Sequence, residues 1–247
     1  MDNFGLQLYT IRGELSGDEA ARAMKRVKEL GYSYVQVAGS LAAIERTGLM
    51  AREIGLEVIG SVGFIEYILA DFDEAVRVHK AIGARDVGVS ADFRSASEVR
   101  EYILKANALA DRLGEVGLSL SYHNHAKEFE DLGGINAMDI LLEESEDINF
   151  ILDTYWVRRG GADTLDMIKR IGAGRMKNLH LKDLSVEPDG PECPIGLGVI
   201  DFKPIVALRD ELGIPNALVE QDNAALSEDS YGQMKISYDN IHHLFEE

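Results

Sequence analysis

The stretch GEVGLSLSYH (114–123) joins the end of one element to the start of another. From Leu118 to His123, apolar residues alternate with serines and a histidine, and this period of two is typical of a β-strand with two different faces. Gly117 precedes the run, and glycine suits the left-handed residue that ends a helix. The same junction recurs at 28–38, 52–62, 80–90, 169–181 and 210–220. We therefore expect helices and strands to alternate along the chain.

Eight β-prone runs are separated by helical segments. They are FGLQLYT (4–10), YVQVA (34–38), LEVIGSV (56–62), DVGVSA (86–91), LSLSYH (118–123), NFILDT (149–154), KNLHLK (177–182) and NALVEQ (216–221). Eight β/α alternations predict a closed (β/α)8 TIM barrel that forms one domain over residues 1–247. A doubly wound open sheet is the rival, but it lacks support from a Gly-rich phosphate loop. The stretch SVEPDGPECPIG (185–196) is expected to be one long loop, typical of a lid or a site wall.

The overall charge restricts the class of partner. The net charge is −18 at pH 7, so most of the surface would repel a nucleic-acid backbone or an anionic membrane. The net charge does not exclude a small phosphorylated substrate, because such a substrate needs only a local basic pocket. Cys193 is the only cysteine, which excludes an intrachain disulfide. With no recognisable secretion signal and no apolar run near the ~20 residues of a membrane span, we expect a cytoplasmic protein without nucleic-acid or membrane partners.

The fifth predicted strand ends in a group of polar residues. Ser119, Ser121 and His123 share one face of this strand. Active sites of TIM barrels lie at the C-terminal ends of the strands. If the alternating apolar residues face the helices, the serines fill the narrow interior and His123 points into the barrel mouth, followed by His125 and Glu128. The alternative is an outward His123 that forms hydrogen bonds at the surface.

Three later strands also end in polar residues. Asp153 follows an apolar run, His180 and Lys182 share an inward parity, and Glu220 ends the last strand. Each signal is weak alone, because an aspartate at a strand end can cap a helix and a strand histidine can be a core residue. Together with His123, however, four consecutive strands would bring imidazole, carboxylate, imidazole and carboxylate to one rim. Such N and O ligands suit one divalent ion, Mn²⁺, Co²⁺, Zn²⁺ or Mg²⁺.

The chain resembles the xylose-isomerase-like TIM barrels, a superfamily that includes sugar phosphate isomerases and epimerases, inosose dehydratases and endonuclease-IV-like proteins. The resemblance lies in the motifs LSYHNHAKEFE (120–130), LDTYWVRRGGAD (152–163), NLHLKD (178–183), PIGLGVIDF (194–202) and LVEQD (218–222). It covers nearly the whole chain and implies one divalent metal at the barrel mouth, held from strands five to eight. Asp153, His180 and Glu220 fall on the last three ligand positions.

The chain departs from the family pattern at two places. Many members present a glutamate at the end of strand five, whereas this chain has His123 there and Glu128 five residues on. Either residue could be the ligand, and we favour His123 because it shares the inward parity of the strand. Leu197 stands where relatives often carry glutamate, so the contact of that loop with substrate is in doubt.

The rim residues and the resemblance together predict a metal-dependent sugar or keto-sugar isomerase or epimerase. A divalent ion that holds two neighbouring sugar oxygens acidifies the C–H beside a carbonyl and stabilises the resulting enediolate. Glu220, Glu128 and His125 are the candidate bases and acids. Proton return at the other carbon gives isomerisation, and return on the opposite face gives epimerisation.

Other residues near the predicted rim are candidates for substrate binding. Lys182 could hydrogen-bond a substrate oxygen, with a Schiff-base role as the competing idea. Trp156 could stack on a sugar ring or pack at the rim, and Gln7 could bind substrate or fill the barrel floor. Arg158 and Arg159 could contact a phosphate, although adjacent arginines are more often solvated.

Three alternative functions remain beside the leading one. A dehydratase or lyase acting on an inosose or a 3-keto-sugar gains support from His123, because a two-glutamate epimerase mechanism would need a carboxylate there. An endonuclease-IV-like hydrolase is opposed by the acidic surface and by the lack of histidine in SVGF (61–64). A non-catalytic sugar-binding protein is opposed by the cost of burying unused charges. The expected partner is a small carbohydrate, and the resemblance is compatible with a homo-oligomer.

Overall fold

Eight parallel strands close into a barrel in the computed structural model, which describes residues 4–17, 19–186 and 190–246. The barrel closes where Gly5 of the first strand pairs with Leu218 of the last. In chain order the strands are β1 (Gly5–Gln7), β2 (Tyr34–Ala38), β3 (Glu57–Phe64), β4 (Asp86–Ser90), β5 (Ser119–His123), β6 (Asn149–Asp153), β7 (Met176–Leu181) and β10 (Asn216–Val219). The predicted (β/α)8 TIM barrel is confirmed.

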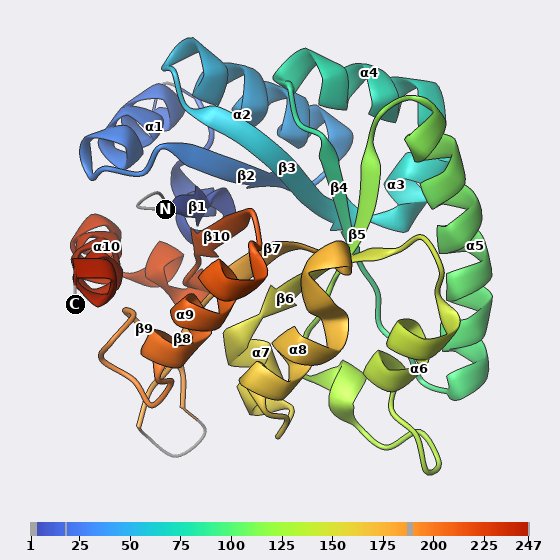
Figure 1. Ribbon diagram of the computed structural model, residues 1–247. Helices are drawn as coiled ribbons and strands as arrows, with labels where there is room; N and C mark the ends of the chain where they lie inside the picture. The colour runs from blue at the N-terminus through green and yellow to red at the C-terminus, as the bar shows by residue number, and fades with distance from the viewer. Residues whose placement is uncertain (1–3, 18, 187–189, 247) are drawn as a thin grey trace.

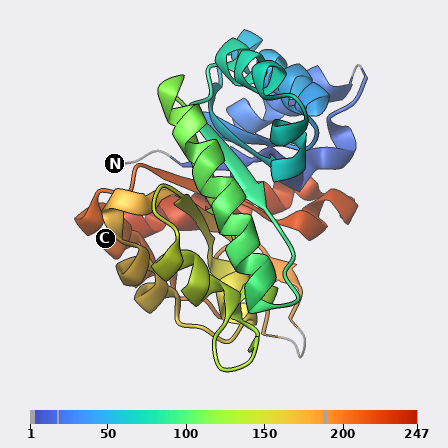
Figure 2. The same ribbon diagram turned by 90° about the vertical axis from the view of Figure 1, so that its right-hand side faces the viewer.

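Helices lie outside the barrel and connect its strands (Figure 1). Helix α5 (Ala96–Glu115) runs along the outer side (Figure 2) and begins after Ser95, whose Oγ accepts a hydrogen bond from Glu98 N. The others are η1 (Leu8–Glu14), α1 (Glu19–Glu29), α2 (Leu41–Glu53), α3 (Ile65–Ala70), α4 (Phe72–Ile82), η2 (Lys127–Phe129), α6 (Ala137–Glu144), α7 (Thr154–Arg159), α8 (Thr164–Arg175), α9 (Phe202–Leu212), η3 (Asp222–Leu226) and α10 (Ser230–Glu246). Among these described helices, none is long and apolar enough to cross a membrane.

The predicted helix-to-strand junctions all contain a glycine in a conformation that other residues rarely adopt. Gly83 has a φ of 76° and ends α4, and Gly117 has a φ of 79° just before β5. The remaining four junction glycines also have positive φ: Gly31, Gly55, Gly172 and Gly213. These residues turn the chain from the helical layer back into the barrel.

Two segments differ from the sequence prediction. Strand β1 ends at Gln7, three residues earlier than expected, because the chain enters η1 and Gln7 Oε1 accepts a hydrogen bond from Tyr9 N (3.2 Å). The predicted loop 185–196 includes part of a short antiparallel hairpin of β8 (Asp183–Leu184) and β9 (Glu192–Cys193). Residues 187–189 of that loop lie outside the described residues.

A polar cluster fills one layer of the barrel interior. Asp86 of β4 is buried, and its Oδ1 accepts hydrogen bonds from the hydroxyls of Ser119 and Ser121, each at 2.7 Å. Asn178 Nδ2 of β7 donates to Asp86 Oδ2 at 2.8 Å. Burial raises the pKa of Asp86, although these donors act against the rise. The inward direction expected for the two serines is therefore correct, and it sets the direction of His123 on the same strand.

Candidate metal and substrate site

Four potential metal ligands converge at the C-terminal ends of consecutive strands. They are His123 at the end of β5, Asp153 at the end of β6, His180 in β7 and Glu220 directly after β10. One nitrogen or oxygen from each residue lies within 4.8 Å of those of the other three, and all four residues are buried. The structure thus brings together the four side chains that the strand parity grouped.

The two oxygens of Asp153 face different neighbours: one caps a helix, and the other points to the remaining potential ligands. Its Oδ1 accepts a hydrogen bond from Trp156 N (3.0 Å) and caps α7. Its Oδ2 faces the cluster, 3.6 Å from His123 Nε2. Among the described residues, neither Asp153 Oδ2 nor either ring nitrogen of His123 has a hydrogen-bond partner. Buried polar atoms without partners are costly and indicate a missing ligand.

His180 is held in one tautomer by a glutamine on β2. Gln36 Oε1 lies 2.7 Å from His180 Nε2 and also accepts a hydrogen bond from Gln7 Nε2 at 2.6 Å. Since this oxygen is an acceptor, His180 donates from Nε2, and its Nδ1 keeps a free lone pair. That Nδ1 lies 2.9 Å from Glu220 Oε2. Two electron-rich atoms at this distance need a cation or a proton between them.

The four residues fit a divalent ion. Two ligands at about 2.1 Å from one ion lie about 3 Å apart at a right angle and about 4 Å apart on opposite sides. The pairs His180 Nδ1–Glu220 Oε2 (2.9 Å) and His123 Nε2–Asp153 Oδ2 (3.6 Å) fall in this range, and all four atoms lie within 4.8 Å of one another. Two imidazoles and two carboxylates suit Mn²⁺, Co²⁺, Zn²⁺ or Mg²⁺ rather than an ion that prefers thiolates.

Lys182 lies next to the four groups, surrounded by carboxylates. Its Nζ is 2.9 Å from Asp222 Oδ2, 3.4 Å from Glu192 Oε1, 3.5 Å from Glu220 Oε2 and 3.6 Å from Asp153 Oδ2. Burial acts to lower the pKa of Lys182, but these carboxylates, led by Glu220, raise it well above the usual value. The ammonium therefore stays charged, which disfavours a Schiff-base role, since the nucleophile would have to be the neutral amine.

The charge of Lys182 also controls the nearby carboxylates. Burial acts to raise the pKa of Asp153 and of Glu220, but Lys182 and the neighbouring histidines together outweigh it and lower both. Both are ionised at neutral pH, as metal ligands must be. Burial raises the pKa of Glu192 to about 7, and burial followed by Glu220 raises that of Asp222. These two groups are poised nearer to neutrality than ordinary carboxylates.

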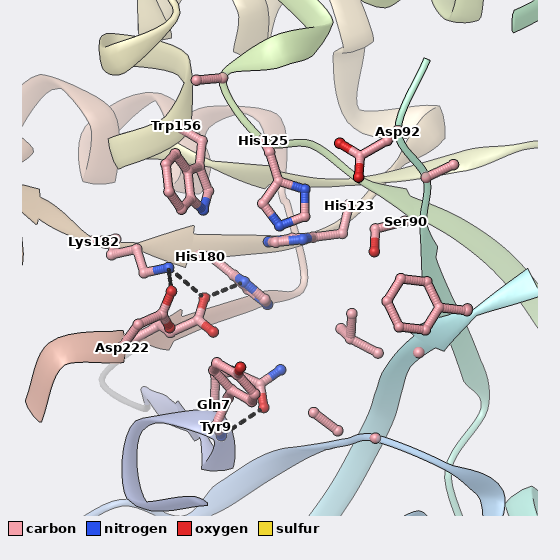
Figure 3. A pocket seen from close by; sticks show the side chains of 18 of the residues that line it. Gln7, Tyr9, Ser90, Asp92, His123, His125, Trp156, His180, Lys182 and Asp222 are labelled. Carbon is pink, nitrogen blue, oxygen red and sulfur yellow. Dashed lines mark hydrogen bonds and ion pairs between the residues drawn. The ribbon is translucent and has the colours of Figure 1, made fainter. Parts of the chain in front are cut away.

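A pocket of about 540 Å³ opens beside the four groups (Figure 3). One side carries polar side chains from the ends of β5 to β10. The opposite side is formed mainly by small and apolar residues at the ends of β2 to β4. His123, His180 and Glu220 reach the pocket, as do Gln7, His125, Trp156, Lys182 and Asp222. A substrate here would meet the candidate metal on one side and an apolar wall on the other.

His125 and Trp156 form an aromatic group at the pocket. The His125 ring contacts those of His123 and Trp156 edge-on, with centroids 5.0 and 5.5 Å apart. Burial and then His123 lower the pKa of His125 to about 4, so its imidazole is neutral at pH 7. Lys182 Nζ lies 5.2 Å from the Trp156 ring centroid. His125 is therefore placed to exchange a proton with a ligand, and Trp156 to contact its apolar face.

Glu128 does not join the four groups and does not line the pocket. The chain turns into η2 after β5, so the strand parity ends before this residue. Tyr122 Oη donates to Glu128 Oε1 at 2.6 Å, and His125 N donates to Glu128 Oε2 at 3.0 Å. The carboxylate is buried and holds the turn that carries His125. Between His123 and Glu128, only His123 lies with the other three potential ligands.

Gln7 reaches the pocket, but its amide is already engaged. Its Nε2 donates to Gln36, and its Oε1 accepts from Tyr9 N. Leu197 has a side chain that is 57% exposed and does not line the pocket. The side chain at the position where relatives often carry glutamate therefore does not reach the pocket in this protein.

The sequence interpretation overlooked three residues of the site: Gln36, Glu192 and Asp222. Asp222 shares the parity of Glu220 two residues earlier, and Gln36 lies in the middle of a predicted strand, so both had a detectable signal. Glu192 reaches Lys182 from a loop without periodicity, which gave no signal. Asp222 Oδ1 is buried in the pocket wall without a hydrogen-bond partner among the described residues.

Comparison with known proteins identifies the family. The Xylose isomerase-like TIM barrel family matches residues 10–229, and the chain belongs to this family. None of the curated proteins matches the sequence. Among solved structures, a sugar phosphate isomerase/epimerase from Parabacteroides distasonis superposes with a TM-score of 0.80 and 21% identity, covering 98% of each chain.

Two further solved structures share the fold. An L-ribulose 3-epimerase has a TM-score of 0.76 and 16% identity, covering 100% of this chain and 95% of its own. A probable 3-DHS dehydratase from Bacillus anthracis has a TM-score of 0.71 and 14% identity, covering 97% of this chain and 98% of its own. At these identities the likeness establishes the fold alone, so the reaction has to be argued from the site.

Proposed function

We propose that this protein is a divalent-metal-dependent isomerase or epimerase of a sugar or keto-sugar. The observation that carries the proposal is the convergence of His123, Asp153, His180 and Glu220, with unpartnered buried ligand atoms, beside a pocket that contains Lys182 and Asp222. A divalent ion held there would supply Lewis-acid stabilisation of charge on oxygens next to a substrate carbonyl. The solved isomerases and epimerases with the same fold support this class of reaction.

Asp222 is the favoured group to move the proton. Asp222 lines the pocket, its buried Oδ1 has no hydrogen-bond partner among the described residues, and its Oδ2 accepts from Lys182 Nζ at 2.9 Å. Glu220, an earlier candidate, is ionised with a lowered pKa, and it faces His180, which makes it a ligand and a weak base. Lys182 can donate to a substrate oxygen and offset negative charge that develops there.

His125 is the candidate second proton-transfer group: neutral at pH 7, it would accept a proton on its face of the substrate, and Asp222, whose pKa is raised, would return one on the other. It stands with His123 on the β5 side of the pocket, whereas Asp222 follows β10. A group on each side of a substrate is what epimerisation requires, because the proton leaves one face and returns to the other. Glu128 has a positioning role in this scheme, since it accepts from the backbone N–H of His125.

Elimination from a keto-sugar or inosose is the second candidate. His123 occupies the strand-five position, so the four groups contain carboxylates only from β6 and from the end of β10. With Asp222 as the one carboxylate base, the proton that it takes could be passed to a departing β-hydroxyl, which would leave as water instead of the proton returning to carbon. An ultraviolet-absorbing unsaturated product would identify this reaction, and a ketose or epimer product would identify the first.

The test is exchange of substrate C–H hydrogen with deuterated solvent, measured by NMR over a panel of ketoses and keto-inositols with Mn²⁺ present. The matched control is Asp153→Asn, which removes the charge of one proposed ligand. Its amide oxygen can still accept the hydrogen bond that caps α7. Exchange in the parent protein that is lost in the control supports the proposal. No exchange across the panel would refute it.

A further inference from the structure

The backbone N–H groups that follow the last two barrel strands already have acceptors within the chain. In TIM barrels that bind phosphate, the site is frequently built from the loops after strands seven and eight, where backbone N–H groups face the anion. In this protein those loops follow β7 and β10. In each of them a carboxylate of the chain accepts the N–H groups.

After β7, the carboxylate of Asp183 occupies the place where a bound anion would accept the backbone N–H groups. Its Oδ2 accepts hydrogen bonds from Gly196 N (2.9 Å) and Gly198 N (3.0 Å). Its Oδ1 accepts from Leu184 N (2.8 Å) and Ile200 N (3.1 Å). Asp183 itself is fully buried. Four donors of the glycine-containing loop are thus bound to one carboxylate and are unavailable to a ligand.

After β10, the carboxylate of Glu192 occupies the corresponding place, next to the pocket. Its Oε2 accepts hydrogen bonds from Asp222 N and from Asn223 N (3.2 Å) at the start of η3. Its Oε1 lies 3.4 Å from Lys182 Nζ. Glu192 is buried, at 8% exposure. The donors and the cation that a phosphate would use here are held by a carboxylate.

The described side chains that line the pocket include no cation without a carboxylate neighbour, and the nearby Arg12 does not line it but donates to the backbone carbonyls of Tyr9 and Asp222. Among the described residues that line it, Lys127 and Lys182 are the cationic ones. Lys127 pairs with Asp92 at 2.9 Å, and both side chains are exposed, so this pair is weak. The charge of Lys182 is already balanced by four carboxylates, so it can donate a hydrogen bond to one sugar oxygen but leaves no excess charge to balance a phosphate dianion. Arg158 and Arg159 lie exposed in α7 and do not line the pocket, and the residues outside the described part include no lysine or arginine.

We infer that this site selects an uncharged sugar and excludes its phosphate esters. The inference rests on the proposed function and names its substrate class. A phosphate in this pocket would meet the carboxylate of Asp222, with Glu192 directly behind it, and the backbone N–H groups at the start of η3 are already bound. Like charges repel more strongly near such a partly buried carboxylate than in open water. The wall that includes Val62 and Phe64 suits the C–H face of a neutral ring.

The test compares matched pairs of ligands on the full chain with Mn²⁺ present. Each pair is a ketose and its terminal phosphate ester, and binding is measured by calorimetry. We expect at least one ketose to bind about tenfold or more tightly than its ester, which corresponds to about 1.4 kcal/mol. A panel in which no ketose binds more tightly than its ester overturns the inference. Deuterium exchange into the same ligands, run in parallel, tests the proposed function separately. If a phosphate ester binds more tightly than every ketose and exchanges its hydrogen, only the inference is refuted. If no ligand exchanges hydrogen, only the proposed function is refuted.

A second experiment uses inorganic phosphate as the probe. Glu192→Ser removes the carboxylate from the donors at η3, and Glu192→Gln is the matched control because its amide oxygen still accepts them. We expect the Ser variant to bind phosphate about tenfold more tightly than the Gln variant and the parent protein. Equal phosphate affinities in all three proteins would contradict the claim that Glu192 fills an anion position.

Discussion

Replacing Gln36 with leucine tests how the chain prepares His180 for an ion. Gln36 is fully buried, and its Oε1 is the acceptor for both His180 Nε2 and Gln7 Nε2. Gln36→Leu has similar volume but no acceptor, so His180 is free to change its tautomer and ring orientation. Loss of such a supporting hydrogen bond typically lowers metal affinity 10- to 100-fold, or about 1.4–2.7 kcal/mol.

The same substitution has a predicted cost in the metal-free protein. Two buried N–H donors lose their acceptor, at about 1–3 kcal/mol each, so we expect the free energy of unfolding to fall by about 2–6 kcal/mol. The control is Gln36→Glu, which keeps an acceptor at the same place. Metal affinity is measured by competition with a chelating dye, and stability by urea denaturation without metal. A Leu variant that binds Mn²⁺ as tightly as the parent protein would refute the role given to Gln36.

Three further changes have defined outcomes. Asp222→Asn should reduce substrate hydrogen exchange by about 10²-fold or more without a large change in Mn²⁺ affinity, because it removes the proposed base but no ligand; unchanged exchange would exclude Asp222. Glu192 has a pKa of about 7 in the folded protein, above its unfolded value, so the folded state binds more protons between pH 4.5 and 7 and stability falls as pH rises through this window. Glu192→Gln should remove this pH-dependent loss, which amounts to roughly 3 kcal/mol over the whole window in metal-free protein, and identical pH profiles of both proteins by urea denaturation would contradict the assignment. Asp183→Ala leaves four N–H groups without their carboxylate, so limited proteolysis should cut the loop 184–200 faster than in Asp183→Asn, with a stability loss of about 2–5 kcal/mol; equal cleavage rates would count against the anchoring role.

The barrel could be predicted because its signals are local and repeated. Each junction glycine, such as Gly83, marks the end of a helix, and the period-two alternation in Leu118–His123 shows which residues point inward. The same parity predicts that His123 and His180 point to the barrel interior, because side-chain direction in a strand follows directly from position.

The parts that escaped prediction lie where parity ends. Glu128 follows a turn, so its direction depends on Tyr122 and on the path of η2. Glu192 comes from a loop whose course depends on tertiary hydrogen bonds to Asp222 and Asn223. Gln36 was detectable as an inward residue, but its partner is 144 positions away in the sequence, and pairing over that distance is set by barrel closure rather than by local pattern.

The measurement that tests the account most directly is anomalous diffraction from crystals soaked in Mn²⁺. We predict one manganese peak per chain, within about 2.0–2.4 Å of His180 Nδ1, Glu220 Oε2, Asp153 Oδ2 and one ring nitrogen of His123. Absence of a peak at saturating Mn²⁺, or a peak held by other residues, would contradict the metal centre and the chemistry built on it.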